Sequence, residues 1–207
     1  MTKVLVLNSS LSGDASASRA LVQTAVDALS RPGVAIIERD LGADPIPHLT
    51  PETVGTIRGA DPTTPVQVQA RALQQALIAE LKDADVLVIG APMYNFAIPS
   101  GLKTWFDHVL RAGETFRYSE AGPEGLVTGK KAIVVLSRGG LYSEGPAVGL
   151  DSQEPHLRTL LGFMGVTDVT FVRAEKLGFG PAAVEEAMAA ARDQIGAVIE
   201  TDFRKAA

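Results

Sequence analysis

Hydroxyl side chains gather in the segment that follows the first apolar run of the chain. Ser10, Ser16 and Ser18 lie there, directly before residues 21–29, whose apolar spacing predicts a helix. Hydroxyl groups and free backbone amides at the amino end of a helix bind phosphate groups, helped by the helix dipole. The alternative is that these serines only cap the helix. Because three of them occur together without a lysine, we expect a phosphate monoester held by neutral donors.

A second group of candidate binding residues follows the apolar run at 86–89. Met93, Tyr94, Asn95 and Phe96 form a loop with large apolar or aromatic side chains and one amide. Such a loop suits a flat heteroaromatic ligand better than a sugar or a metal ion. The alternative is an apolar loop that packs against the next helix.

A third candidate segment, Ser137-Arg138-Gly139-Gly140, follows the apolar run at 132–136. Two adjacent glycines allow the backbone to approach a ligand closely, and successive amides can donate hydrogen bonds to carbonyl oxygens. The alternative is a tight turn without a ligand.

The elements that position these loops alternate between strand and helix. Continuous apolar runs predict five buried strands, and apolar stripes predict the helices between them. We therefore expect one α/β domain over residues 1–207, with a doubly wound five-stranded parallel sheet in the order 2-1-3-4-5. The predicted strands are 4–7, 34–37, 86–89, 132–136 and 169–172, and the predicted helices are 21–29, 73–81, 102–110 and 181–198.

In that order, the three candidate loops follow neighbouring strands at the edge of the sheet where such folds bind ligands. A phosphate loop, an aromatic loop and an amide-donor loop then converge on one ligand. That ligand is a phosphorylated flat ring with carbonyl groups along one edge, a description that flavin mononucleotide (FMN) meets.

Two connections are longer than a bare sheet needs. Residues 41–66 are rich in proline and include a short capped helix that begins near Thr50 and ends near Arg58. Residues 112–129 hold two aromatic residues followed by a glycine-rich stretch. Long loops are often functional, so we expect both to fold over the ligand edge of the sheet, with solvated excursions as the alternative.

Composition excludes several kinds of site and partner. The chain has no cysteine, so disulfides, thiolate metal sites and thiol nucleophiles are ruled out. His48, His108 and His156 have no partners at motif spacing, so we expect neither a metal site nor a hydrolytic triad. A net charge of -5 argues against nucleic acid as a partner. No apolar run is long enough for a membrane span or a secretion signal, so we expect a soluble cytoplasmic protein.

Over nearly its whole length the sequence resembles the FMN-dependent NADH-azoreductases, also described as NADH:quinone oxidoreductases, of flavodoxin-like fold. The Met-Tyr-Asn-Phe loop followed by Ser-Arg-Gly-Gly at this interval is specific, whereas no single short motif would be. Further matching segments are Pro45-Ile46-Pro47, Arg111-Ala112-Gly113 and the stretches 115–118, 122–131 and 165–168.

This resemblance implies bound FMN and a homodimer with two flavin sites at the subunit interface. It implies no catalytic side chain, because the flavin N5 atom carries the chemistry. Two residues depart from the family pattern: Ala17 replaces a frequent polar residue and leaves only its amide, and Tyr142 lies where some relatives have a histidine. The implied FMN contacts are Ser10, Ser16, Ala17, Ser18, Met93, Tyr94, Asn95, Phe96, Ser137, Arg138, Gly139 and Gly140.

The implied activity is the reduction of quinones and azo compounds by a ping-pong, two-electron hydride mechanism, with NADH or NADPH as the donor. The sequence does not decide between the two donors and does not name the physiological acceptor. We expect Tyr118 and Phe163 to form aromatic walls of the substrate pocket, although Phe163 is equally suited to the core. Two other classes stay open: a flavodoxin-like electron carrier, and a scaffold without flavin, for which Asp14 and Ala17 are the motivation.

Overall fold

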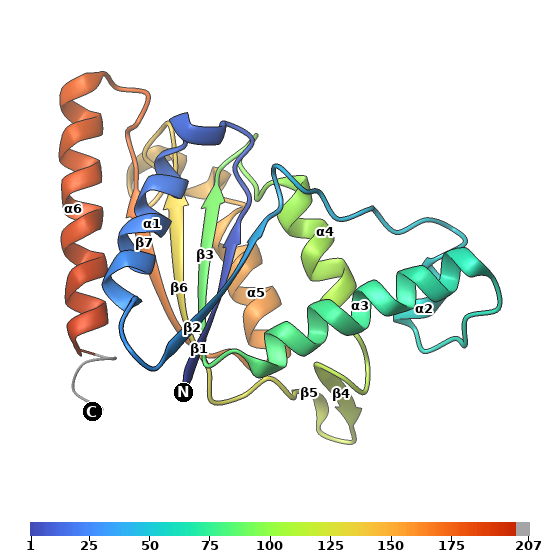
Figure 1. Cartoon of the computed structure of the whole chain (residues 1–207). Helices are drawn as coiled ribbons and strands as arrows, with labels where there is room; N and C mark the ends of the chain where they lie inside the picture. Colours follow the sequence, from blue (N-terminus) through green and yellow to red (C-terminus); the bar gives the residue numbers. More distant parts are fainter. Residues whose placement is uncertain (202–207) are drawn as a thin grey trace.

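A parallel sheet of five strands forms the centre of the molecule in the computed structural model, which describes residues 1–201 (Figure 1). The strand order is β2-β1-β3-β6-β7, which confirms the predicted order of the five parallel strands. Each predicted strand forms and is longer than its apolar run, because backbone pairing continues beyond the buried residues. The strands are β1 (Thr2–Asn8), β2 (Val34–Asp40), β3 (Val86–Pro92), β6 (Lys131–Ser137) and β7 (Asp168–Ala174).

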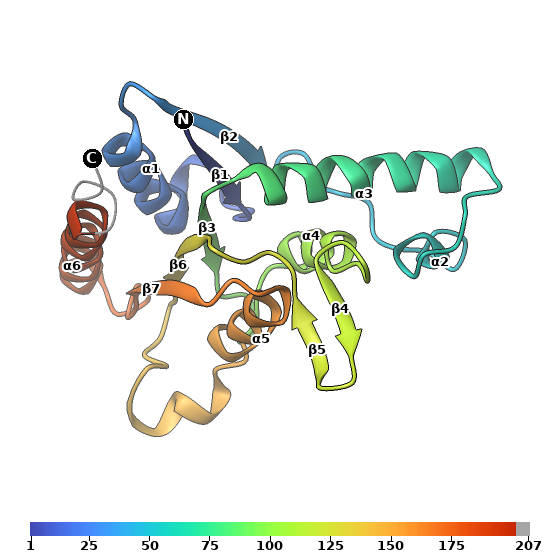
Figure 2. The ribbon, with the colours of Figure 1, turned by 90° about the horizontal axis from the view of Figure 1, so that it is seen from below.

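Helices cover both faces of this sheet, as the view from below shows (Figure 2). Successive side chains of a strand point to opposite faces, so Val4 and Val6 pack on one side while Leu5 and Leu7 pack on the other. Helices α1 and α6 cover the first side, and α3, α4 and α5 cover the second. Their bounds are α1 (Ala17–Leu29), α3 (Pro65–Asp83), α4 (Ser100–Val109), α5 (Glu154–Met164) and α6 (Pro181–Ile199).

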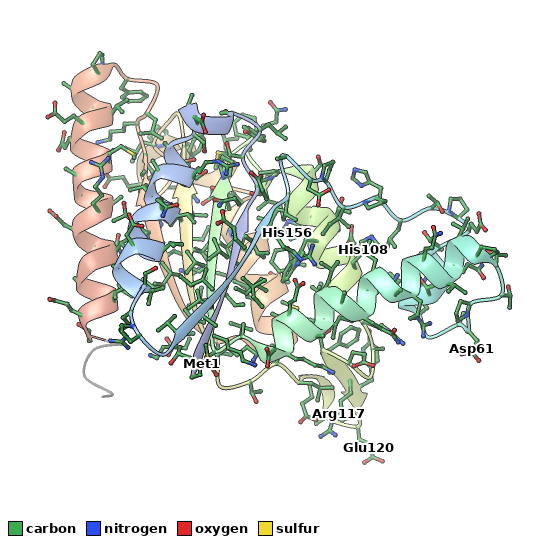
Figure 3. All side chains as sticks on the ribbon, in the orientation of Figure 1. Met1, Asp61, His108, Arg117, Glu120 and His156 are labelled. Carbon is green, nitrogen blue, oxygen red and sulfur yellow. The ribbon has the colours of Figure 1, made fainter. Side chains whose placement is uncertain are left out.

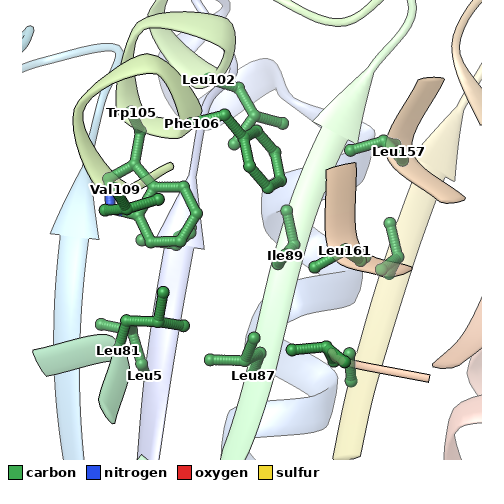
Figure 4. Packing of buried hydrophobic residues seen from close by; sticks show 14 of the residues in the cluster. Leu5, Leu81, Leu87, Ile89, Leu102, Trp105, Phe106, Val109, Leu157 and Leu161 are labelled. Atoms are coloured by element: carbon green, nitrogen blue, oxygen red, sulfur yellow. The ribbon is translucent and has the colours of Figure 1, made fainter. Parts of the chain in front are cut away.

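The larger of the two hydrophobic cores lies between the sheet and helices α3 to α5 (Figure 4). Trp105 and Phe106 of α4 are fully buried there, with their rings edge to face at 5.0 Å. Full burial of each large apolar side chain contributes about 1.5–3 kcal/mol. This core holds the strand ends in place and so fixes the positions of the loops that follow them.

Helix α5 was not among the predicted helices. Its signals are nevertheless present in the sequence: Pro155 lies in the first turn, and Leu157, Leu161 and Met164 are spaced for one buried face. Gly165 ends the helix with φ 97°, a left-handed conformation that favours glycine.

The expectation that residues 112–129 fold over the ligand edge was wrong. They contain an antiparallel hairpin of β4 (Phe116–Ser119) and β5 (Gly122–Gly125), which lies at the opposite end of the sheet (Figure 1). The reason is topological. Helix α4 runs back from the carboxyl edge, so the segment that joins it to β6 must lie at the amino edge of the parallel sheet.

The other long connection, residues 41–66, has two parts that lie in different places. Its beginning lies at the ligand edge, where Leu41, Pro45 and Ile46 share a cavity with Ser9 and Pro99. Its remainder extends away from the sheet with the short helix α2 (Val54–Ile57), which packs beside α3 (Figure 1). Within residues 1–201, no helix is both long and apolar enough to cross a membrane.

Candidate functional site

A cavity of about 180 Å³ lies where β1, β3 and β6 end. Its lining comes from all three loops that the sequence singles out: residues 10–17, 92–94 and 137–139. Leu177, which sequence reasoning missed, completes the wall. Because parallel strands end at one edge, residues far apart in the chain meet here, as is usual for ligand sites of this architecture.

The first loop ends at the amino terminus of α1 and leaves two backbone amides available. The Ser16 hydroxyl caps the helix by accepting a hydrogen bond from the Arg19 amide at 3.2 Å, and it lies 3.1 Å from the Ser18 hydroxyl. Capping therefore does occur. The amides of Ala17 and Ser18, the first two of the helix, have no partner within residues 1–201. They remain free to bind an anion together with the neighbouring hydroxyls.

The charged side chains near this loop do not compete with an anion or neutralise it. The Arg19 guanidinium is 2.5 Å from the Asp40 carboxylate and is held by that pair. Asp14 is exposed to solvent, in the short 3-10 helix η1 (Gly13–Ala15). The donors that face the cavity from this loop are therefore neutral, as expected from the absence of lysine.

Tyr94 connects the second loop to the first. Its phenol oxygen accepts a hydrogen bond from the Leu11 amide at 2.9 Å and lies 3.5 Å from the Ser10 hydroxyl. Burial acts to raise the pKa of Tyr94, but hydrogen bonds with Ser10, Leu11 and Ser12 outweigh it and the pKa lies below its ordinary value. The phenol thus fixes the distance between the two loops.

The Asn95–Phe96 turn carries the only positive φ values of non-glycine residues in the three loops, 47° and 72°. Two hydrogen bonds between Tyr94 and Ala97, at 3.0 and 3.1 Å, close this turn. They leave the amides of Asn95 and Phe96 without partners among the described residues. Left-handed backbone at such residues costs energy and tends to occur at functional sites. The Phe96 side chain is 45% exposed and follows Met93 and Tyr94, which line the cavity, so it offers an aromatic surface at the rim. Of the expected contacts, Ser18, Asn95, Phe96 and Gly140 are not part of the lining itself.

The third loop is held by its carbonyl groups, which leaves amides for a ligand. The carbonyls of Arg138, Gly139 and Gly140 accept hydrogen bonds from the segment 176–178 at 2.8–3.1 Å. The amides of Gly139 and Gly140 have no partner within residues 1–201. A Cβ atom at Gly140 would lie 3.0 Å from the ring of Tyr142, so a larger residue here would push that ring aside.

Arg138 lines the cavity but has no free donor there. Its amide donates to the Ala174 carbonyl at 2.9 Å, and its guanidinium turns into the protein. The side chain is 0% exposed and contacts Asp151 at 2.8 Å, Glu175 at 3.0 Å and Gln153 at 2.8 Å. Among residues 138–140, only the two glycines therefore offer amides to a ligand.

Tyr118 and Phe163 do not reach this cavity within one chain. Tyr118 is on β4 and Phe163 is near the carboxyl end of α5, and both pack against Phe116, with ring centroids 5.6 and 4.6 Å away. Arg117 and Glu120, next to Tyr118, mark this end of the molecule in Figure 3. Both residues precede a strand of the sheet, so the chain places them at the amino edge.

Other kinds of site find no support in the part of the chain that the structure describes. No group of three or more histidine or acidic side chains is placed to hold a metal ion within residues 1–201. His48 pairs with Thr104 at 2.9 Å, and His108 pairs with the Pro47 carbonyl at 2.8 Å. The cavity instead combines free amides, hydroxyls and an aromatic rim, which suits a phosphate ester linked to a flat ring.

Comparisons with known proteins agree with this chemistry. Residues 2–199 match the family described as having a flavodoxin-like fold. The FMN-dependent NADH:quinone oxidoreductase of Hyphomonas neptunium is 56% identical over 203 residues, which are 97% of each chain. That of Ralstonia nicotianae is 51% identical over 193 residues, covering 91% of this chain and 93% of the relative. The crystal structure of an azoreductase from Bacillus anthracis has a TM-score of 0.88 and 29% identity, over 97% of this chain and 100% of that one. The chain therefore belongs to the flavodoxin-like fold family and, within it, to the FMN-dependent NADH:quinone oxidoreductases.

Proposed function

We propose that this protein binds FMN in the cavity at the ends of β1, β3 and β6 and uses NADH to reduce quinones. The observation that carries the proposal is the convergence of three loops whose free amides and hydroxyls match the two polar parts of that cofactor. The names of the relatives in Hyphomonas and Ralstonia support the same assignment of cofactor, donor and acceptor.

Each loop has its own part in holding the cofactor. The amides of Ala17 and Ser18, with the hydroxyls of Ser10 and Ser16, would bind the phosphate group. The Asn95–Phe96 turn would hold one edge of the ring. The residues fit a phosphate monoester because a phosphate held by neutral donors near a helix terminus needs no cation.

The amides of Gly139 and Gly140 would donate to a carbonyl at the other edge of the ring. Preorganised donors at that edge favour negative charge there. When bound, FMN supplies the two-electron redox chemistry, with donor and acceptor using the site in turn, as in a ping-pong reaction. The protein supplies placement and electrostatics, which explains why no side-chain acid–base pair lines the cavity.

We further propose that the functional unit is a homodimer. Tyr118 is 74% exposed at the amino edge, although an aromatic residue of that size is ordinarily more buried. In a dimer with two flavin sites at the interface, Tyr118 and Phe163 of one subunit would form the substrate wall of the other. Azo compounds would be reduced in the same pocket, and NADPH would be a second donor.

Anaerobic spectroscopy tests the proposed activity. The purified protein should bind FMN, lose its yellow colour on addition of NADH and recover it when benzoquinone is added. Riboflavin, which lacks the phosphate, should bind at least tenfold more weakly than FMN. A yellow protein inert to NADH would support an electron carrier instead, and a protein that binds no FMN would refute the proposal.

Two further measurements address the finer points. Analytical ultracentrifugation should give twice the chain mass, and a monomer would exclude shared pockets. Steady-state kinetics with NADH and NADPH against quinones and an azo dye should give parallel double-reciprocal lines, as expected for a ping-pong reaction. Intersecting lines would exclude that mechanism.

A further inference from the structure

Arg138 is a buried cation that connects the two turns proposed to hold the cofactor ring. A charged side chain with 0% exposure is rare and persists only where partners compensate for its lost hydration. Its Nε donates to the Gln153 Oε1 at 2.8 Å, while its two terminal nitrogens contact Asp151 at 2.8 Å and Glu175 at 3.0 Å. The planar guanidinium satisfies three partners in three directions at once.

Two of these partners, Asp151 and Gln153, belong to a segment that is hydrogen-bonded to the Asn95–Phe96 turn and to the end of β3. Gln153 is itself fully buried and donates from Nε2 to the carbonyl of Ala91, at the end of β3. The adjacent Ser152 amide donates to the carbonyl of Phe96 at 3.0 Å. Through segment 151–153, Arg138 is thus tied to the Asn95–Phe96 turn, more than 40 residues away in sequence.

The third partner, Glu175, holds the segment that follows the Gly139–Gly140 turn. One carboxylate oxygen of Glu175 accepts hydrogen bonds from the amides of Tyr142 and Ser143 at 2.8 and 3.1 Å, and the other accepts from the Ser143 hydroxyl. Burial acts to raise the pKa of Glu175, but the hydrogen bonds from Ser143, Tyr142 and Arg138 outweigh it, and the pKa is lowered. The carboxylate therefore stays ionised beside Arg138.

Tyr142, whose amide Glu175 holds, contacts both turns. Its ring meets the Phe96 ring edge to face, with centroids 6.1 Å apart, and it lies directly against Gly140. It therefore stands between the two turns whose amides are free. A shift of either Glu175 or segment 151–153 would change the spacing between these turns.

We propose that Arg138 is a positioning residue that sets the distance between the Asn95–Phe96 turn and the Gly139–Gly140 turn, without touching the cofactor by its side chain. The ligand class is the ring of FMN, so this inference rests on the proposed function. Binding of the FMN ring therefore depends on the Arg138 side chain, although this side chain points away from the site. The KM for NADH depends on it too, because NADH would stack on the face of that ring.

The chain offers a matched control within the same ionic cluster. Arg158 contacts Glu154, a neighbour of the Arg138 group, but its side chain is 55% exposed and it bonds to no rim segment. Arg158→Gln removes one guanidinium from the cluster without loosening either turn. Arg138→Lys keeps the buried charge, so it preserves folding, but an ammonium cannot reach three partners in the same plane.

The first measurement uses the protein without added cofactor. Amide hydrogen exchange at Tyr142, Ser143 and Ser152 should become at least tenfold faster in Arg138→Lys and in Glu175→Gln, and should be unchanged in Arg158→Gln. Unchanged exchange in both Arg138→Lys and Glu175→Gln, or equal acceleration in the control, would overturn the proposal. This result does not depend on whether FMN binds.

The second measurement uses the holoenzyme. Arg138→Lys should weaken FMN at least tenfold and raise the KM for NADH more than it lowers kcat, with less loss than Arg138→Met. If the wild type binds FMN and both variants bind it equally well, Arg138 has no positioning role. If the wild type binds no FMN, the proposed function fails, and the exchange measurement alone decides whether Arg138 positions the two turns.

Discussion

Gly42 offers a direct test of whether the first loop is part of the cofactor site. A Cβ atom at this position would lie 2.2 Å from the backbone carbonyl oxygen of Ser10, and real Cβ atoms essentially never come closer than 3.0 Å to other atoms. In Gly42→Ala the two backbones must therefore separate by about 0.8 Å. Gly42 is held by the Asp40 carboxylate, which accepts from its amide at 3.0 Å, so the Ser10 loop has to move.

The expected size of the effect follows from the contacts involved. Overpacking of this kind costs about 1–3 kcal/mol of stability, which for a chain of this size lowers Tm by roughly 3–10 °C. Displacement of Ser10 would remove its proposed hydrogen bond to the charged phosphate, worth about 1.5–3 kcal/mol. The Kd for FMN should therefore rise about 10- to 100-fold.

Gly125→Ala is the matched control for this experiment. Its Cβ atom would lie 2.2 Å from the Gly165 backbone nitrogen and 2.4 Å from two further backbone atoms, so the clash at the amino edge of the sheet is at least as severe. Fluorescence titration with FMN and thermal unfolding of both variants separate the two effects. Both variants should melt earlier, but the loss of FMN affinity should be much larger in Gly42→Ala than in Gly125→Ala. Wild-type affinity in Gly42→Ala, or the same loss in Gly125→Ala, would refute the placement of the phosphate beside Ser10.

Three further outcomes are expected. Tyr94→Phe removes the acceptor for the Leu11 amide and should weaken FMN about tenfold, measured by the same titration, with secondary structure by circular dichroism unchanged. Glu175 has a pKa below its ordinary value of 4.5, so its contribution to stability is fully present above about pH 4.5 and is lost as the pH falls through the lowered native pKa. Denaturant unfolding across this range should therefore show a steeper acid decline for the wild type than for Glu175→Gln. Arg117 and Glu124 pair in solvent across the hairpin, so Arg117→Gln should leave Tm at the wild-type value, whereas a clear drop would contradict this reasoning.

The sequence by itself determined the sheet and the edge at which the loops meet. Buried parallel strands need continuous apolar runs, and such runs are local signals that can be recognised without knowing their partners. The order of the strands then follows from the handedness of the crossovers and from the commonness of one arrangement. Helix α5 carries equally local signals, in Pro155, the apolar spacing and Gly165, so it too is predictable from the sequence.

The sequence could also predict that Ser16, Asn95 and Gly139 lie close together, because each follows a strand of the same edge. It could not predict which donors remain free. Whether an amide is available depends on partners such as the Ala174 carbonyl for Arg138, and those partners lie far away along the chain. Sequence spacing alone contains no information about such pairs.

Only the tertiary structure decided the direction of the longer side chains and the end of the molecule at which each connection lies. Arg138 lines the cavity, but its guanidinium points to Glu175 and Asp151, because a buried cation must find its counter-charges inside the fold. Tyr118 was expected at the same site, yet helix α4 carries the chain to the opposite edge before β4 begins. Both results depend on contacts between distant segments, which form only when the whole chain has packed.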